Sequence, residues 1–168
     1  WALTVLYLWR GFKDNKIIDW FLVGLFAGFG FLSKYLFIYF LISVALFFIY
    51  SIYFKKIKKP DFKYFIILEI FAVLLVPHTI WLFNNDFITI TYGLKRAGLE
   101  NSNIINHIKF PLIFLLKQIG LLIPFSILLW LLIKKFKFKI NLNDQKLTFL
   151  VFINLVPFIL ILATSIVT

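Results

Sequence analysis

Residues 30–40 read GFLSKYLFIYF and set one lysine, Lys34, in an apolar run that covers residues 20–54. As a single helix this run would be about 52 Å long at 1.5 Å per residue, whereas the hydrocarbon core of a bilayer is about 30 Å thick. The run is therefore too long for one membrane span. We expect two helices, 20–33 and 35–54, joined by a tight reversal at Lys34.

The composition of the whole chain indicates a membrane protein. Hydrophobic residues make up 62% of the 168 residues, and the mean hydropathy is +0.98. A soluble domain of this length cannot bury that much apolar surface in one core. Because apolar stretches recur along the chain, we predict an all-α fold, a polytopic transmembrane helical bundle. The expected single domain, 1–168, has about five spans plus a partial first one: 1–9 (partial), 20–33, 35–54, 64–83, 110–133 and 147–167.

The basic residues are concentrated in three loops, and this pattern predicts the orientation. Five lysines fall in residues 55–63 and five in 134–146, while residues 10–16 add one arginine and two lysines. By the positive-inside rule these loops face the cytoplasm. The segment 84–109 is then an outer loop, and Lys34 lies on the same outer side. The net charge of +11 is thus explained by topology, and no nucleic-acid partner is expected.

Two interpretations of Lys34 remain open from the pattern alone. A lysine at a helix end can extend its ammonium to the interface at little cost. The alternative is an anion site at the outer leaflet, because an ionisable group within a membrane segment costs roughly 2.5 to 3.5 kcal/mol on insertion scales and calls for a partner. Phosphate is the partner that we expect.

Gly24 and Gly28 form a GxxxG pair just upstream. Small residues at this spacing let two membrane helices approach closely, so we assign them to helix packing. A nucleotide-binding glycine loop is excluded, because the stretch GFGFLS lacks a third glycine and any βαβ context.

Metal and thiol chemistry find no support in the sequence. The chain has no cysteine, and His78 and His107 are too isolated to form a metal site. We expect His78 to be a packed helix residue, and no cofactor is evident. Since the chain begins at Trp1 and contains no methionine, we expect an internal fragment whose functional residues lie partly elsewhere.

The stretch VPHTIWLFNNDFITITYGLKRAG, residues 76–98, leads from a span into the outer loop. Trp81 suits the aromatic belt at a membrane interface. Apolar residues alternate with threonines after Asp86, and their spacing fits either a short surface helix or an extended segment. Either way we expect an amphipathic segment on the membrane surface.

Taken in order, GLFAGFGFLSKYLFIYF, a basic loop, PHTIWLFNNDFITITYGLKRAG and FPLIFLLKQIGLLIPFSILLWLLI resemble the middle of bacterial family 39 glycosyltransferases. These are polytopic GT-C enzymes related to protein O-mannosyltransferases, to the aminoarabinose transferase of lipid A and to Rgt-type transferases of lipopolysaccharide core. The resemblance implies transfer of a sugar from a polyprenyl-phosphate donor to a cell-envelope acceptor: lipid A, core saccharide, polysaccharide or protein. It implies the inner membrane of a bacterium, with the active site facing the periplasm.

The resemblance also implies roles for particular residues. Lys34 and Arg96 would bind the donor phosphate, although Arg96 also fits a surface arginine that touches lipid headgroups. The general base of such enzymes is a carboxylate in a first outer loop, which is expected upstream of Trp1. The substrate cavity would be lined by Tyr35, Trp81, Tyr92 and Asp86.

A non-enzymatic membrane protein is the rival interpretation. A transporter or flippase of lipid-linked saccharides would share the spans and the membrane lipids as partners, but transporters tend to show internal repeats, and we find none. A GT-C polymerase or ligase would belong to the same enzyme class. The donor sugar, the acceptor, metal dependence and the oligomeric state are not specified by these residues.

Overall fold

The computed structural model describes residues 1–54, 61–96, 106–133 and 144–167. Within these ranges the chain is helical and contains no strand. Four helices are long and apolar enough to cross a membrane, and a shorter apolar helix accompanies them. The predicted class, an all-α polytopic membrane protein, is confirmed. The chain divides into two compact units, Trp1–Thr91 and Tyr92–Thr168, so the single domain stays a prediction, and we describe each unit by itself.

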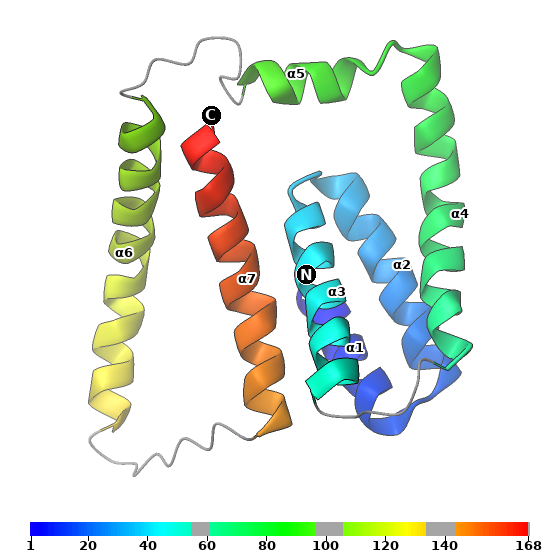
Figure 1. Ribbon diagram of the computed structural model, residues 1–168, viewed down its shortest axis with the longest axis horizontal. Coiled ribbons are helices and arrows are strands. Elements are labelled where there is room, and N and C mark those ends of the chain that lie inside the picture. Colours follow the sequence, from blue (N-terminus) through cyan, green and yellow to red (C-terminus); the bar gives the residue numbers. More distant parts are fainter. Residues whose placement is uncertain (55–60, 97–105, 134–143, 168) are drawn as a thin grey trace. The chain divides into compact units, whose positions relative to one another are not determined.

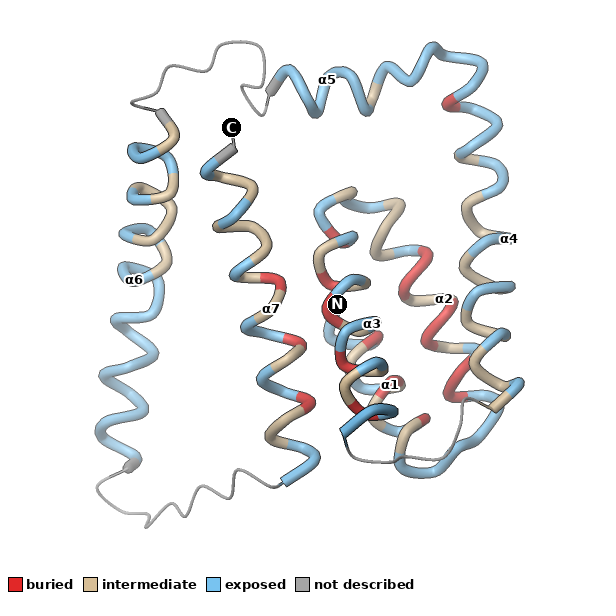
Figure 2. The backbone as a smooth tube through the Cα atoms, in the orientation of Figure 1, coloured by how far each residue is buried: buried red, intermediate tan, exposed pale blue. Residues whose placement is uncertain are grey.

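The first unit is built around α2 (Figure 1). Its helices are α1 (Ala2–Asp14), α2 (Ile17–Ser33), α3 (Phe37–Phe54), α4 (Lys63–Asn84) and the start of α5 (Ile88–Arg96). Helix α2 contacts α1, α3 and α4. Its buried residues recur along the helix (Figure 2), as expected for the central member of a packed group. The N-terminal segment, expected as a partial span over 1–9, extends as a helix to Asp14.

The long apolar run is two helices, as its length predicts. Helix α2 ends at Ser33 and α3 begins at Phe37, and Lys34 lies in the reversal between them. A Cβ atom at Gly30 would lie 2.5 Å from the ring of Phe37, so only glycine lets the chain fold back this tightly. Since α2 has 17 residues, it is about 25 Å long, shorter than a hydrocarbon core of about 30 Å.

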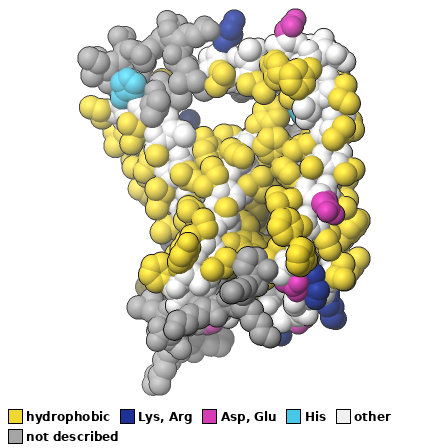
Figure 3. All heavy atoms as spheres, turned by 45° about the vertical axis from the view of Figure 1, so that its right-hand side comes forward, with side chains coloured by type: hydrophobic (Ala, Val, Ile, Leu, Met, Phe, Trp, Pro, Cys, Tyr) yellow, Lys and Arg dark blue, Asp and Glu magenta, His cyan; other side chains and the backbone are white. Residues whose placement is uncertain are grey.

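The glycine pair of α2 packs against α4, which confirms its assignment to helix packing. A Cβ at Gly24 would lie 2.8 Å from the carbonyl oxygen of Ile67, and one at Gly28 would lie 2.6 Å from Leu74 Cδ1. The two backbones are therefore closer than any larger residue permits. On the side that faces away from α2, α4 exposes hydrophobic side chains. Basic side chains gather near the end at which α4 begins, at the lower right of Figure 3.

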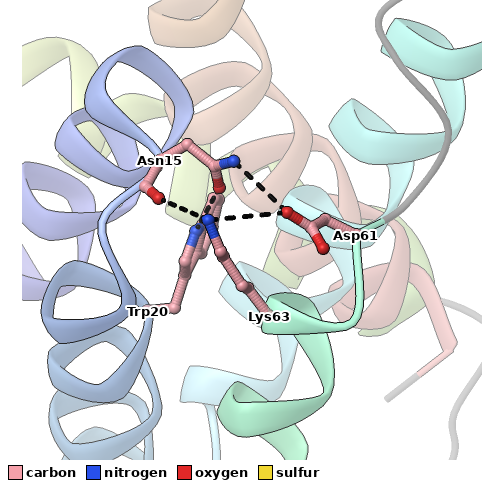
Figure 4. A network of polar contacts seen from close by, with 4 residues as sticks. All are labelled: Asn15, Trp20, Asp61 and Lys63. Carbon is pink, nitrogen blue, oxygen red and sulfur yellow. Dashed lines mark hydrogen bonds and ion pairs between the residues drawn. The ribbon is translucent and has the colours of Figure 1, made fainter.

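Polar contacts close the end of the first unit where α1 turns into α2 and where α4 begins (Figure 4). Asn15 has a left-handed backbone, with φ 49°, and reverses the chain. Its amide oxygen accepts a hydrogen bond of 3.0 Å from Trp20 Nε1, and its amide nitrogen donates one of 3.3 Å to Asp61. Lys63 donates to the Asn15 carbonyl at 3.1 Å and lies 3.7 Å from the Asp61 carboxylate. The α1–α2 turn is thereby tied to the start of α4.

The second unit contains a pair of long helices. These are α6 (Asn106–Ile133) and α7 (Gln145–Val167), which contact each other. The rings of Phe114 and Phe158 lie 5.6 Å apart. His107, near the start of α6, donates from Nδ1 to the carbonyl of Ile166 near the end of α7, so the two helices run antiparallel.

Candidate functional site

Three of the sequence-predicted residues, Lys34, Tyr35 and Trp81, lie at the end of the first unit opposite the Asn15 contacts. Lys16 precedes α2 and Lys34 follows it, so the two lysines mark opposite ends of one helix. At the Lys34 end, the α2–α3 reversal meets the end of α4 and the start of α5. Helix α4 places His78 and Trp81 one turn apart on the same face, because they are three residues apart.

Tyr35 is the centre of this cluster. Its hydroxyl lies 2.7 Å from His78 Nε2 and 2.8 Å from Thr89 Oγ1. The rings of His78 and Trp81 stack with centroids 6.0 Å apart and an interplanar angle of 13°. Phe31 packs against Tyr35 with ring centroids 5.7 Å apart. Tyr35 therefore connects three segments that are far apart in the sequence: the α2–α3 reversal, α4 and the first turn of α5.

Lys34 has a fixed backbone and an exposed side chain. Its N–H donates to the Gly30 carbonyl at 3.2 Å, and its carbonyl accepts from Phe37 N–H at 2.9 Å. Its side chain is exposed, and neither of the ion pairs found among the described residues involves it. The reversal thus presents a cation on a well-held segment of backbone, at the end of a helix that is short for a membrane span.

Asp86 lies in the turn between α4 and α5. Asp86 and Phe87 both have left-handed backbones, with φ 47° and 53°. The turn is closed by a hydrogen bond of 3.0 Å from Phe87 N–H to the Leu82 carbonyl, and Asn85 Nδ2 donates to the Trp81 carbonyl at 2.8 Å. A positive φ is uncommon for a bulky residue such as phenylalanine. The turn bends the chain so that α5 starts beside the α2–α3 reversal and brings Thr89 to Tyr35.

Helix α5 resolves the alternative that the spacing left open, since Ile88–Arg96 is a short helix. Tyr92 is exposed on it. The second unit begins at Tyr92, so the predicted proximity of Tyr92 and Arg96 to Lys34 stays a prediction. Several predicted features lie outside the described residues. They are the side chain of Arg96, Glu100 in the outer loop, and most of the two lysine-rich loops.

His78 and Thr89 are the two hydrogen-bond partners of Tyr35 that sequence reasoning missed. The expectation that His78 is a packed helix residue was incomplete, because the ring is half-buried and also hydrogen-bonded. One signal was available: a histidine within a membrane segment is by default a residue with a functional or bonding partner. No sequence signal identified Thr89, whose role depends on the turn at Asp86 and Phe87.

Among the described residues, no group of three or more histidine, aspartate or glutamate side chains that could hold a metal ion is present. The arrangement instead combines one exposed cation, an aromatic pair and two hydroxyl groups. Such a surface can bind an anion through Lys34. The ring of Trp81, which is 43% exposed, can bind a molecule that has both polar and apolar faces.

Comparison with known protein families gives a match over the first part of the chain. Residues 1–81 match the family model of dolichyl-phosphate-mannose-protein mannosyltransferases. The matched range contains Lys34, Tyr35, His78 and Trp81, and it ends before Asp86 and α5. No curated protein and no solved structure matches the chain.

Proposed function

We propose that this protein is a membrane glycosyltransferase that moves a sugar from a polyprenyl-phosphate donor to a cell-envelope acceptor. The observation that carries the proposal is the match of residues 1–81 to the mannosyltransferase family, together with the exposed Lys34 in the reversal that those residues form. The family's printed name specifies a lipid-phosphate-linked sugar, and a phosphate in that donor is the anion that Lys34 would bind.

The reaction replaces one bond to the anomeric carbon by another. The bond from that carbon to the donor phosphate oxygen breaks, and a bond to the acceptor hydroxyl oxygen forms with inversion. A carboxylate accepts the hydroxyl proton as general base. The departing lipid phosphate gains negative charge, so a cation placed there stabilises the transition state more than the ground state.

In this scheme Lys34 holds the donor phosphate through a charge-assisted hydrogen bond. Arg96 is proposed as a second phosphate ligand, because a guanidinium can donate to two phosphate oxygens at once. Tyr35, Trp81, Tyr92 and Asp86 are proposed to line the cavity that receives the sugar. The site would face the periplasm of a bacterial inner membrane, in agreement with the positive-inside assignment.

The test is a transfer assay on the full-length protein in membranes. A panel of radiolabelled polyprenyl-phosphate sugars is supplied, and label is followed into the envelope fraction. We expect transfer with at least one donor. In Lys34→Gln the rate of transfer should fall about tenfold to a hundredfold, because the variant loses a hydrogen bond to a charged group. Lys16→Gln is the matched control, since Lys16 lies at the opposite end of the same helix.

Arg96 is tested in the same assay. Both Arg96→Ala and Arg96→Lys should impair transfer, because a lysine cannot donate two parallel hydrogen bonds. Normal turnover of Arg96→Ala would show that Arg96 does not bind the donor phosphate. Movement of intact lipid-linked sugar across the membrane without transfer to any acceptor would support the transporter interpretation and refute the glycosyltransferase.

A further inference from the structure

The Tyr35 hydroxyl makes two hydrogen bonds to segments on either side of it, and both can be satisfied at once. A phenol has a single proton, so it donates one bond and accepts the other. Either Thr89 donates to Tyr35 and Tyr35 donates to His78 Nε2, or His78 Nε2–H donates to Tyr35 and Tyr35 donates to Thr89. Because the two contacts are 2.7 and 2.8 Å long, both hydrogen bonds can form with either neutral tautomer of His78.

These bonds act on the segment that carries Lys34. Backbone hydrogen bonds fix Lys34 to Gly30 on one side and to Phe37 on the other. They orient the reversal relative to α2 and α3, but they do not determine its position relative to α4 and α5. The packing of Gly24 and Gly28 holds the body of α2 against α4. At the reversal itself the Tyr35 side chain adds a further restraint, because its hydroxyl reaches both α4 and α5.

We propose that Tyr35 is a positioning residue that holds Lys34 in place for the phosphate of a lipid-linked ligand, with His78 and Thr89 as the partners that fix Tyr35. This inference rests on the proposed function, in which Lys34 binds the phosphate of a polyprenyl-phosphate donor. Tyr35 acts on the ligand through Lys34, and His78 and Thr89 act through Tyr35. The cluster therefore links the reversal in the matched region to α5, which lies beyond it.

The test uses the full-length protein in detergent and two probes that differ only in the phosphate, a polyprenyl monophosphate and the corresponding polyprenol. Tyr35→Phe removes the hydroxyl and keeps the ring contacts with Phe31 and His78. Both hydrogen bonds of the hydroxyl are lost, but neither is made to the ligand, so we expect binding of the monophosphate to weaken by only about threefold to tenfold, less than in Lys34→Gln. Binding of the polyprenol should not change, whereas a general loss of structure would weaken both.

The conservative pair at Thr89 tests the partner. Thr89→Ser keeps the hydroxyl and should bind the monophosphate as the wild type does. Thr89→Val removes one of the two bonds of Tyr35 and should weaken binding by no more than Tyr35→Phe does. The matched control is Thr79→Val in α4, because among the described residues the Thr79 hydroxyl bonds within its own helix, to the Leu75 carbonyl. Thermal unfolding of each variant confirms that the compared proteins are folded.

A double-mutant cycle decides whether Tyr35 acts through Lys34. In a Lys34→Gln background, Tyr35→Phe should weaken monophosphate binding by less than about twofold, because the ligand contact that it positions is gone. The same loss in both backgrounds, or no loss in the wild-type background while Lys34→Gln binds weakly, would overturn the positioning role alone. Wild-type affinity of Lys34→Gln would overturn both this inference and the phosphate assignment.

Discussion

The packing of α2 on α4 gives a sharp prediction for Gly24→Ala. The new Cβ would lie 2.8 Å from the Ile67 carbonyl oxygen and 3.0 Å from Ile70 Cβ. Because the first contact is to backbone, no side-chain rotation relieves it, and the helices must separate by about 0.6 Å to restore an ordinary van der Waals distance of about 3.4 Å. Overpacking of this kind typically costs about 1 to 3 kcal/mol.

Helix propensity works in the opposite direction, and a control measures it. Alanine is favoured over glycine within a helix by about 1 kcal/mol. At Gly120, in α6, a Cβ would have no described atom within 4 Å, so Gly120→Ala reports propensity alone and should stabilise by up to about 1 kcal/mol. Gly24→Ala should be net destabilising by about 0 to 2 kcal/mol, so that the two variants differ by about 1 to 3 kcal/mol.

The assay is thermal unfolding of the purified full-length protein in one detergent, with the wild type and both variants measured together. We predict a lower midpoint for Gly24→Ala and an equal or higher midpoint for Gly120→Ala. Gly28→Ala should be tolerated better than Gly24→Ala, because its closest contact is the end of the flexible Leu74 side chain. If Gly24→Ala unfolds at the same temperature as Gly120→Ala or above it, close packing at the glycine pair is refuted.

Of three further predictions, two concern the end of the first unit where α1 turns into α2, and the third concerns topology. Arg10 Nε lies 3.2 Å from the carboxylate of Asp19, whose side chain is fully buried. Arg10→Gln would leave that carboxylate without its cation and should destabilise the protein by about 1 to 3 kcal/mol, less than for a fully buried pair, because Arg10 is 45% exposed; an unchanged unfolding midpoint would contradict this. The hydrogen bond from Asn15, supported by Lys63, lowers the pKa of Asp61 below its ordinary 3.8. This contact therefore stabilises the protein above pH 3.8, and the stabilisation is lost as the pH falls through the lowered pKa. Asn15→Ala should flatten the acid part of the stability–pH profile, and a profile identical to that of the wild type would refute the coupling. For topology, cysteines introduced at Phe62 and Asp86, on either side of α4, should be labelled in intact cells by an impermeant maleimide only at Asp86, and the reverse pattern would invert the assignment.

Sequence reasoning predicted the helices better than the site, for a physical reason. The break at Lys34 follows from the length of an apolar run against a fixed bilayer thickness, and the packing of Gly24 follows from residue size. These are local properties of the chain. The predicted and observed helix starts differ by a few residues. The helix expected over 110–133 begins at Asn106, and the one expected over 147–167 begins at Gln145.

The contacts around Tyr35 depend on the tertiary arrangement and were not predictable in this way. Tyr35 was selected only through the family resemblance. Its bonds to His78 and Thr89 join residues 43 and 54 positions away, and the second requires left-handed backbones at Asp86 and Phe87, which few sequence rules assign to such residues. The Asn15 contacts at the opposite end were missed because Asn15 and Asp61 resemble ordinary polar loop residues.

The central claim is that Lys34 binds a lipid-linked phosphate, and equilibrium binding of a polyprenyl monophosphate to the purified full-length protein tests it most directly. At matched folded fraction, Lys34→Gln should bind about tenfold to a hundredfold more weakly than the wild type, while Lys16→Gln, at the other end of α2, should bind as the wild type does. Equal affinities of Lys34→Gln and the wild type would contradict the claim and leave Lys34 as a residue that only anchors a helix end.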